Sequence, residues 1–392
     1  MSKVTLTFIS LLMASSFFFA SSMYSPSLPD IETSLNTTAS LAQQSMSYFF
    51  VALAISQLIC GPLSERFGRK PIALISSLIY LLGSIGCLMS DNIHVLLLSR
   101  IIQGAGVGGL YLLCRTILQD SFSRTELMGL LAWMGVLFMA LPGLTPVIGG
   151  YISECYGWMG NFVFMAVIGF IITLVIFFIK KETIKEINPN AIKPKQMLND
   201  YWMIASDTTF LAFLAMMFSA NSCIMLFQIT GAFVANNEFS LSATQFGICS
   251  IALITSSITA RLIWNRYLKN NITDNTTMSW GCAIQLVGSV ITTYSISVNS
   301  FVMIVIGFTV TAFGASLLIT IAAVSALYLF PNHKGQVGAI YGALQMLAAS
   351  IFTLCLSMLP TTHTTLVEVS WLLALVAIAA LLLLKKKATQ LA

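Results

Sequence analysis

Residues Gly61–Lys70 read GPLSERFGRK and separate two long apolar runs, 41–62 and 71–90. Three bases and one acid fall within this short stretch, whereas neither apolar run carries a charge. An uncharged run of about 20 residues is long enough to cross the hydrocarbon core of a bilayer as a helix. The stretch therefore predicts a tight turn between two membrane-spanning helices. Gly61 and Gly68 would let the backbone pass closely there or adopt a left-handed conformation.

Apolar runs of the same kind recur along the whole chain. Of its 392 residues, 57% are hydrophobic and only 8% are charged, where a soluble domain usually has about a quarter charged residues. Twelve runs are predicted to span the membrane: 5–25, 41–62, 71–90, 93–114, 125–148, 159–180, 208–230, 243–264, 277–297, 301–323, 335–358 and 366–384. Runs of this length must satisfy their backbone hydrogen bonds internally, and the alternating pattern of a membrane barrel is absent. The predicted fold class is an all-α membrane protein with twelve transmembrane helices.

The charged residues outside these runs differ between the two sides of the membrane. If the N-terminus is placed in the cytoplasm, the loops on the other side carry only acids: Asp30, Glu32, Asp91, Glu154, Glu238 and Glu368. The lysines and arginines outside the runs then fall in cytoplasmic segments or at cytoplasmic helix ends, as the positive-inside rule requires. This predicts a multi-pass protein of a bacterial-type inner (cytoplasmic) membrane, surrounded by the lipid bilayer, with both termini cytoplasmic and no nucleic-acid partner.

A polar segment divides the twelve runs into six and six. Residues 180–200 read KKETIKEINPNAIKPKQMLND, which is basic and punctuated by two prolines, as in a cytosolic linker. The predicted domains are an N-terminal six-helix bundle over 1–180, a cytoplasmic linker over 181–207 and a C-terminal six-helix bundle over 208–392. Two six-helix bundles around a central path are the architecture of many secondary transporters.

The charged stretch 61–70 resembles the G-x-L-a-D-r-x-G-r-K signature of the major facilitator superfamily, with glutamate at the usual aspartate position. The resemblance implies a gating latch formed by Gly61, Leu63, Glu65, Arg66, Gly68, Arg69 and Lys70. In this latch Glu65 is expected to accept hydrogen bonds from Arg66, from Arg69 or from the N-terminal amides of a neighbouring helix. The alternative is that the basic cluster only anchors the turn on the cytoplasmic side.

Arg100 lies within the fourth predicted span, in LLLSRIIQGAGVGG. An arginine at the membrane centre costs about 2.5–3.5 kcal/mol on insertion scales, so it marks a functional site by default. With Gln103 and Gly104 it resembles the superfamily's R-x-x-q-G element, which implies a role in proton coupling or in holding the first helix. Two alternatives remain: the side chain donates to backbone carbonyls as part of the packing, or it extends to the outer interface.

Small residues and prolines share the fifth predicted helix, in GVLFMALPGLTPVIGGY. The residues concerned are Pro142, Gly143, Pro146, Gly149 and Gly150. They would bring helices close together and bend this one. The stretch resembles the superfamily's antiporter signature ending G-P-x-x-G-G, with Thr145 replacing the glycine before the proline, and so implies an exporter or antiporter. The alternative is a kinked packing helix.

Two further stretches resemble the bicyclomycin/chloramphenicol-resistance branch of drug:proton antiporters: SSMYSPSLP at 21–29 and GQVGAIYGALQMLAAS at 335–350. That branch normally places a proton-binding aspartate before Met-Tyr in the first helix, where this chain has Ser22. A serine hydroxyl does not titrate near neutral pH, and no other run has an acid near its middle. Asp30, together with Arg100, is therefore the remaining candidate for proton coupling. The alternatives are a different coupling mechanism or a facilitator.

The first run is itself expected to be a retained helix. Its uncharged stretch is longer than the apolar core of a typical signal peptide, and eleven further spans follow. Pro26 and Pro29 are expected to break this helix as it leaves the membrane.

If the superfamily arrangement holds, the first, fourth, seventh and tenth helices line the substrate cavity. The candidate lining residues are Phe18, Ser21, Ser22, Tyr24, Gln103, Asn221, Met225, Gln228 and Thr320, with Phe17 and Tyr111 beside them. Aromatic walls with a few polar groups suit an apolar or amphipathic small molecule, and flexible methionines suit several different ones. For any one of these residues the alternative is simple helix packing.

The sequence lacks the motifs that would indicate an enzyme, a disulfide framework or a metal site. Eight cysteines are scattered without a C-x-x-C pair, three histidines lie far apart, and no phosphate-cradling glycine loop or nucleophile elbow is present. We therefore predict no enzyme, no cofactor and no metal, but a monomeric secondary transporter that exports drugs or metabolites in exchange for protons. The rival is a dedicated carrier of one small-molecule substrate, such as a siderophore or a metabolite, that runs in either direction and without proton coupling.

Overall fold

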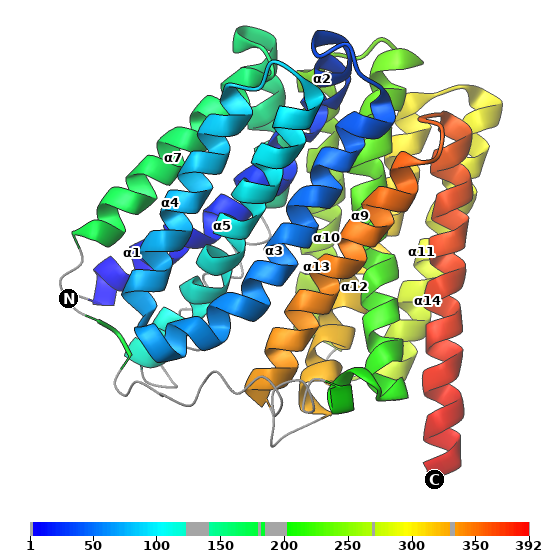
Figure 1. Cartoon of the computed structure of the whole chain (residues 1–392). Coiled ribbons are helices and arrows are strands. Elements are labelled where there is room, and N and C mark those ends of the chain that lie inside the picture. The colour runs from blue at the N-terminus through cyan, green and yellow to red at the C-terminus, as the bar shows by residue number, and fades with distance from the viewer. Residues whose placement is uncertain are drawn as a thin grey trace. The chain divides into compact units, whose positions relative to one another are not determined.

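The computed structural model describes residues 3–122, 141–178, 182–184, 202–268, 271–329 and 334–391. The chain divides into two compact units, Met1–Gln196 and Met197–Ala392. Every regular element in the described residues is a helix (Figure 1), and eleven spans among them are long and apolar enough to cross a membrane. The predicted all-helical membrane fold is confirmed over these residues. Most of the predicted fifth run, 125–148, and most of the predicted linker, 181–207, lie outside them.

The first helix of the N-terminal unit changes its pitch instead of ending at its prolines. It consists of α1 (Lys3–Phe18), the π-helical segment η1 (Phe19–Met23), the 3-10 segment η2 (Ser25–Ser27) and α2 (Leu28–Ser34). Pro26 and Pro29 each occupy the first turn of their segment, where a helix needs no N–H from them. The predicted break of the regular α-helix is present, since α1 ends at Phe18 and α2 begins at Leu28, but the candidate span continues from Thr5 to Ser34.

The other helices described in this unit are α3 (Ala39–Phe67), α4 (Arg69–Leu88), α5 (Ile93–Ser121), a helix over 141–156 and α7 (Met159–Phe177). Helix α3 is longer than the predicted run 41–62, because it continues through most of the charged stretch. The predicted turn is thus a single residue, Gly68, which links α3 directly to α4. Its φ of 100° is a conformation that glycine adopts without a steric penalty.

Helix α5 packs against α1, α3 and α4 within this unit (Figure 1). Small residues let the backbones approach closely. A Cβ at Gly104 would overlap the Phe49 carbonyl oxygen of α3, and a Cβ at Gly106 would overlap the Tyr80 amide nitrogen of α4. Because α5 touches three neighbours this closely, one of its side chains can reach several helices at once.

The C-terminal unit contains six candidate spans among its described residues. Its helices are α9 (Thr208–Asn237), α10 (Ala243–Ile263) with the π-helical segment η3 (Trp264–Leu268), α11 (Asp274–Val298), α12 (Phe301–Tyr328), α13 (Lys334–Ser357) and α14 (His363–Leu391). Polar side chains cap the N-termini of α9, α10 and α11. Asp207 accepts from the Phe210 amide, and Ser242 and Gln245 form a reciprocal capping pair. These caps set where α9 and α10 begin.

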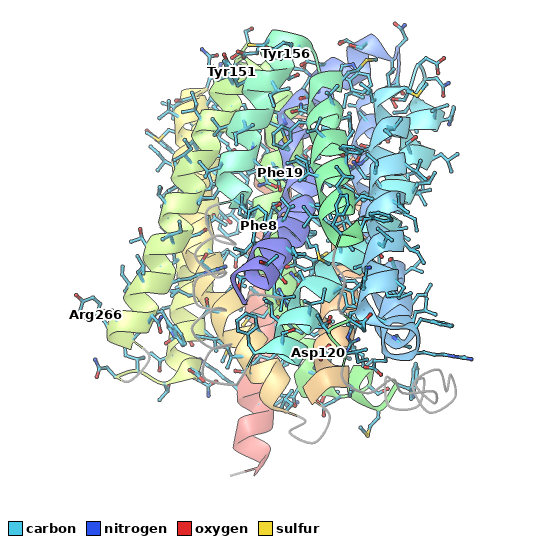
Figure 2. All side chains as sticks on the ribbon, turned by 90° about the vertical axis from the view of Figure 1, so that its left-hand side faces the viewer. Phe8, Phe19, Asp120, Tyr151, Tyr156 and Arg266 are labelled. Atoms are coloured by element: carbon cyan, nitrogen blue, oxygen red, sulfur yellow. The ribbon has the colours of Figure 1, made fainter. Side chains whose placement is uncertain are left out.

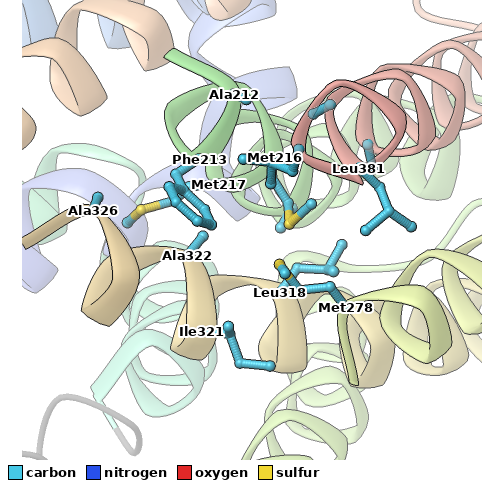
Figure 3. Packing of buried hydrophobic residues seen from close by; sticks show 14 of the residues in the cluster. Ala212, Phe213, Met216, Met217, Met278, Leu318, Ile321, Ala322, Ala326 and Leu381 are labelled. Carbon is cyan, nitrogen blue, oxygen red and sulfur yellow. The ribbon is translucent and has the colours of Figure 1, made fainter. Parts of the chain in front are cut away.

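A cluster of apolar side chains packs the C-terminal helices together (Figure 3). Met216 of α9, Leu318 of α12, Met278 of α11 and Leu381 of α14 are all buried in it. Methionine has several rotatable bonds and fills irregular gaps between helices. The four helices are thus held by an apolar core that all of them share.

Candidate functional site: an arginine clamp on the first helix

Arg100 of α5 is fully buried, with 0% of its surface exposed, and its guanidinium joins three helices. Nη2 donates to the carbonyl oxygen of Ala20 in η1 (2.9 Å), and Nε donates to the carbonyl oxygen of Ser45 in α3 (3.5 Å). Nη1 donates to Gln103 Oε1 on α5 itself. The side chain therefore holds the π-helical segment against α3 and α5. We call the following residues the arginine clamp: Ala20, Tyr24, Ser45, Phe49, Arg100 and Gln103.

Two aromatic rings enclose the charge of Arg100. Its Cζ lies 4.4 Å from the centroid of the Tyr24 ring and 4.3 Å from that of Phe49. The Tyr24 hydroxyl is fixed in turn, 2.9 Å from Ser45 Oγ. Among the described residues no carboxylate hydrogen-bonds to Arg100, so carbonyl dipoles and ring faces stabilise its charge. Of the two alternatives that the sequence left open, the structure shows donation to carbonyls; a side chain this buried does not extend to the interface.

Gln103 connects the clamp to two further helices. Its Nε2 donates to Ser84 Oγ on α4 (2.9 Å) and to Met165 Sδ on α7 (3.5 Å), while its Oε1 accepts from Arg100. The side chain is fully buried. The sequence places Gln103 on a cavity wall, whereas the structure makes it the residue that orients Arg100 inside the unit.

The helix over 141–156 meets the π-helical segment with its small residues. Gly149 lies so close to η1 that a Cβ there would overlap the Met23 carbonyl oxygen. The small-residue element includes four buried members, Gly143, Pro146, Gly149 and Gly150, and one half-buried member, Pro142. This element therefore brings a second helix into backbone contact with the segment that Arg100 holds.

Ser21 and Ser22 are buried in η1, as is Phe18 just before it, and both serines bond locally. Ser21 Oγ donates to the Phe18 carbonyl oxygen (3.5 Å) and lies 3.3 Å from Ser22 Oγ. Ser25 Oγ donates to the Ser22 carbonyl oxygen (2.9 Å). Short hydroxyl side chains of this kind satisfy carbonyls that an irregular helix leaves without a regular partner. At the position where the resembled antiporters carry an acid, this chain has a locally bonded hydroxyl.

Asp30 lies near the end of the same span and contacts the fifth helix. Its Oδ2 accepts from Ser153 Oγ (3.1 Å), and the side chain is half-buried. Nearby, Ser27 Oγ accepts from Asn161 Nδ2 of α7 (3.0 Å). No hydrogen bond or ion pair joins Asp30 to Arg100 in the described part of the chain. Asp30 on the first helix and Arg100 on α5 are thus separate sites, and Arg100 contacts the first helix ten residues before Asp30, at Ala20.

The latch lies at the other end of the N-terminal unit. Figure 2 shows Asp120 at one end of this unit and Tyr151 and Tyr156 at the opposite end. Arg69 Nε donates to Asp120 Oδ2 of α5 (2.9 Å), and its Nη1 donates to Ser64 Oγ of α3 (2.7 Å). One arginine at the start of α4 therefore joins three helices.

A second carboxylate, Glu182, caps the N-terminus of α4. Its Oε1 accepts from the amide of Arg69 (3.0 Å) and its Oε2 from the amide of Lys70 (3.1 Å). The first amides of a helix have no partner within the helix and carry a partial positive charge, so a carboxylate is favoured there. Gly68 leaves room for this group, because a Cβ at Gly68 would lie 2.6 Å from Glu182 Oε2.

The remaining latch residues are less buried than Arg69. Glu65 and Arg66 are exposed, Leu63 and the side chain of Lys70 are half-buried, and a Cβ at Gly61 would meet only Leu112 at 3.7 Å. The prediction that Glu65 accepts the hydrogen bonds was wrong, because Asp120 and Glu182 accept them. The sequence signal for Asp120 is an acid in the last turn of a spanning helix, which basic residues nearby could reach.

The cavity candidates of the C-terminal unit lie on α9 and α12. Asn221, Met225 and Gln228 share one face of α9; the first two are half-buried and Gln228 is 8% exposed. Asn221 Nδ2 and Thr320 Oγ1 each donate to a carbonyl of their own helix, at 3.0 Å and 2.7 Å. The role of these residues in binding cargo stays a prediction.

Comparison with known proteins decides the family. A family model described as Major Facilitator Superfamily matches residues 10–353. The chain belongs to this superfamily. Multidrug resistance protein D of Escherichia coli (strain K12) is 25% identical to this superfamily member over 347 residues, which cover 88% of this chain and 86% of that protein. A bicyclomycin resistance protein homolog of Haemophilus influenzae is 24% identical over 250 residues, which cover 64% of this chain and 63% of that protein.

Solved structures share the fold of this superfamily member. The POT family transporter PepTSo matches with a TM-score of 0.79 at 13% identity, covering 100% of this chain and 99% of that one. The xylose transporter XylE from Escherichia coli, partially occluded and inward-open, matches with a TM-score of 0.72 at 13% identity, covering 98% of each chain. At these identities the likeness concerns the fold alone. The chain is a multi-pass membrane transporter and not an enzyme, and its predicted likeness to drug exporters is confirmed.

The latch of this superfamily transporter can be tested with one substitution. Asp120→Asn keeps the shape of the side chain and removes the charge that faces Arg69, so we expect the free energy of unfolding to fall by roughly 1–2 kcal/mol. The transport rate should fall several-fold, because α4 and α5 lose their charged contact. Thermal unfolding and transport of the purified protein measure both. Glu65→Gln is the matched control, since Glu65 is exposed. Equal losses in the two variants would show that the acid at 65 matters as much as Asp120.

Proposed function

We propose that this superfamily transporter exports small amphipathic molecules from the cytoplasm across a bacterial inner membrane. The observation that carries the proposal is the relative named multidrug resistance protein D, which aligns with most of both chains. The small-residue element adds support. It resembles the exporter signature of the superfamily, and Gly149 within it lies in backbone contact with the first helix.

The proposed transport cycle is alternating access, in which each bundle moves as a packed body. The arginine clamp supports this, because Arg100 ties the first helix to α3 and α5. The π-helical and 3-10 segments interrupt the regular bonding of that helix, and such interruptions are frequent at functional positions. In this proposal the first helix bends within 19–27 while Arg100 keeps hold of Ala20. The latch around Arg69 opens and closes at the other end of the unit.

In the same proposal Asp30 binds the coupling proton. It is a half-buried acid on the first helix, whereas Ser22 has no group that titrates. Asp30→Asn keeps the size of the side chain and leaves it neutral at every pH, so we expect the proton release that follows cargo addition to be lost. A pH-indicator dye measures this release from the purified protein. Asp91→Asn is the matched control, because Asp91 is an exposed acid in a loop predicted on the same side of the membrane. Unchanged proton release in Asp30→Asn would remove Asp30 from the coupling and leave the proposed export standing.

Flux into inside-out membrane vesicles tests the export itself. We expect vesicles that contain the transporter to accumulate a fluorescent amphipathic compound faster than vesicles without it. Collapsing the pH gradient should slow this accumulation if protons drive it. Flux only in the opposite direction would overturn the proposed export.

A second candidate is a dedicated carrier of one compound, such as a siderophore or a metabolite. Ser22 favours it, since the position that holds an acid in the resembled antiporters has a serine with local bonds only. A panel of unrelated toxic compounds separates the two candidates. Expression of a multidrug exporter lowers susceptibility to several of these compounds, whereas expression of a dedicated carrier changes susceptibility to one at most.

A further inference from the structure

Acidic side chains are missing from the interior of every predicted span. The only acids inside the twelve apolar runs are Glu126 and Glu368, and each lies within three residues of the end of its run. By contrast, Arg100 is the eighth residue of α5, and Arg115 lies fifteen residues further along the same helix. The apolar runs of the N-terminal unit therefore hold a positive charge in their interior and no negative one. Two acids of the longer helical spans, Asp30 and Asp120, lie near the span ends and bond to Ser153 and Arg69.

We propose that the exported molecules are amphipathic anions, selected by Arg115 and by the buried charge of Arg100. The inference rests on the proposed export function and adds the charge of the cargo to it.

Arg115 borders an aromatic surface shared by α5 and α1. Its Nη2 donates to the Tyr111 hydroxyl (3.1 Å), and its Cζ lies 5.1 Å from the centroid of the Tyr111 ring. That ring packs on Phe17 of α1, with 4.6 Å between the centroids and 31° between the planes. Arg115 is exposed, and both rings are half-buried. A guanidinium beside two packed rings offers donors to an anionic group and a flat apolar surface to the rest of the molecule.

The two arginines lie on one face of α5, the face toward α1. Arg100, Tyr111 and Arg115 are separated by eleven and four residues, close to three turns and one turn of a helix. Arg100 reaches Ala20 and Tyr111 packs on Phe17, so both contact the first helix. At 1.5 Å per residue, Arg115 lies about 22 Å from Arg100 along the helix axis. A ligand beside Tyr111 therefore meets the Arg115 charge directly, and the buried Arg100 charge lies further along the same helix.

Arg100 acts through its field and not through contact. Each of its three nitrogen atoms already donates to the protein, and no exposed surface is left for a ligand. A charge in a low-dielectric interior acts over longer distances than one in water. A cationic cargo beside Arg115 would be repelled, and the apolar runs hold no interior carboxylate to pair with it. Asp120, five residues further along α5, is already bonded to Arg69. An anionic cargo meets attraction at both arginines.

Three fluorescent probes that differ in charge alone test the inference. They are dansyl-aminohexanoate, its primary amide and dansylcadaverine, which share one aromatic group and end in an anion, a neutral amide and a cation. Binding is measured by fluorescence anisotropy on the full-length transporter in nanodiscs of zwitterionic lipid, so that the lipid surface does not sort the probes. We expect the anion to bind about tenfold more tightly than the cation, with the amide between them.

Substitutions of single arginines show which residue sets the preference for the anionic probe. Arg115→Gln should reduce the anion-to-cation affinity ratio roughly fivefold or more and leave the affinity of the amide unchanged. Arg115→Lys should keep most of the ratio, because the charge is retained. Arg266→Gln removes an exposed arginine elsewhere in the chain and should leave the ratio unchanged, which controls for the net charge of the protein.

The possible outcomes separate the inference from the export function beneath it. Equal or tighter binding of the cation overturns the anion inference, and so does an affinity ratio that Arg115→Gln leaves intact. If all three probes also accumulate equally in inside-out vesicles, the export function stands and only the charge selection fails. If none of the probes binds or accumulates, the proposed export of amphipathic molecules falls and the anion inference falls with it.

Discussion

Replacing Arg100 with lysine is expected to lower the transport rate roughly a hundredfold, because lysine keeps the charge and loses the clamp. An ammonium group lacks the planar fork that reaches Ala20, Ser45 and Gln103 together, and it does not stack between two rings. A hydrogen bond to a charged group contributes about 1.5–3 kcal/mol, so losing two of them costs about 3 kcal/mol or more. Since about 1.4 kcal/mol corresponds to a factor of ten, the clamped state becomes roughly a hundredfold rarer.

Transport in proteoliposomes and thermal unfolding of the purified protein measure this effect. Arg266→Lys is the matched control, because Arg266 is exposed and the same substitution there removes no buried contact. Arg100→Lys also distinguishes the geometry of the clamp from its charge. The charge is kept, so the binding that remains should still prefer the anionic probe. A variant that transports at the wild-type rate would show that the clamp is not needed for the cycle.

Gly149→Ala is expected to reduce transport to the background level, because the added Cβ would overlap the Met23 carbonyl oxygen. Backbone atoms have little freedom to withdraw, so the fifth helix must move away from the first or the π-helical segment must change its shape. Inserting a methyl group into a well-packed core usually costs about 1–3 kcal/mol, and a backbone neighbour places this site at the upper end. The amount of folded protein in the membrane and the transport per molecule are the two quantities to measure.

Gly231→Ala provides the matched control for that substitution. Gly231 lies inside α9, and the nearest atom to an added Cβ belongs to the Phe227 side chain at 3.4 Å, which is an ordinary contact. The change also exchanges a poor helix former for the best one, worth about 1 kcal/mol in favour of the helix. We expect wild-type transport and unchanged or higher stability. Equal losses at both glycines would mean that the helices tolerate no added methyl group anywhere, and the special contact at Met23 would lose its support.

Much of the fold could be predicted from the sequence, because lipid imposes a simple rule on long apolar runs. The helical spans and the superfamily follow from run lengths and from the motif at 61–70. The first span continues beyond its prolines for a local reason. Proline disrupts a helix where its N–H is needed, and Pro26 and Pro29 each lie in the first turn of a new segment, in which it is not.

The partners of the site residues could not be predicted in the same way. Arg100 bonds to a carbonyl 80 positions earlier in the chain, and the Lys70 amide bonds to an acid 112 positions later. Such pairs depend on how helices cross, and residue types along one segment do not encode that. Glu65 was predicted to be the acceptor because it occupies the acid position of the resembled signature, yet it is exposed on α3. The position of Arg100 within an apolar run suggested that it is buried. Nothing in the sequence indicated that the rings of Tyr24 and Phe49 enclose it.

The serine at position 22 has a consequence for the energy source of the transporter. A bacterial cytoplasm is electrically negative, so an anion that leaves the cell moves down the voltage across the membrane. At 100 mV this is worth about 2.3 kcal/mol for each charge, or a concentration ratio of roughly fifty. A carrier whose cargo bears the charge feels that voltage directly, in addition to the driving force of the proton that Asp30 is proposed to bind. In the proposed exporter of anions, the hydroxyls of Ser21 and Ser22 bond within their own helix, and the voltage acts on the cargo itself.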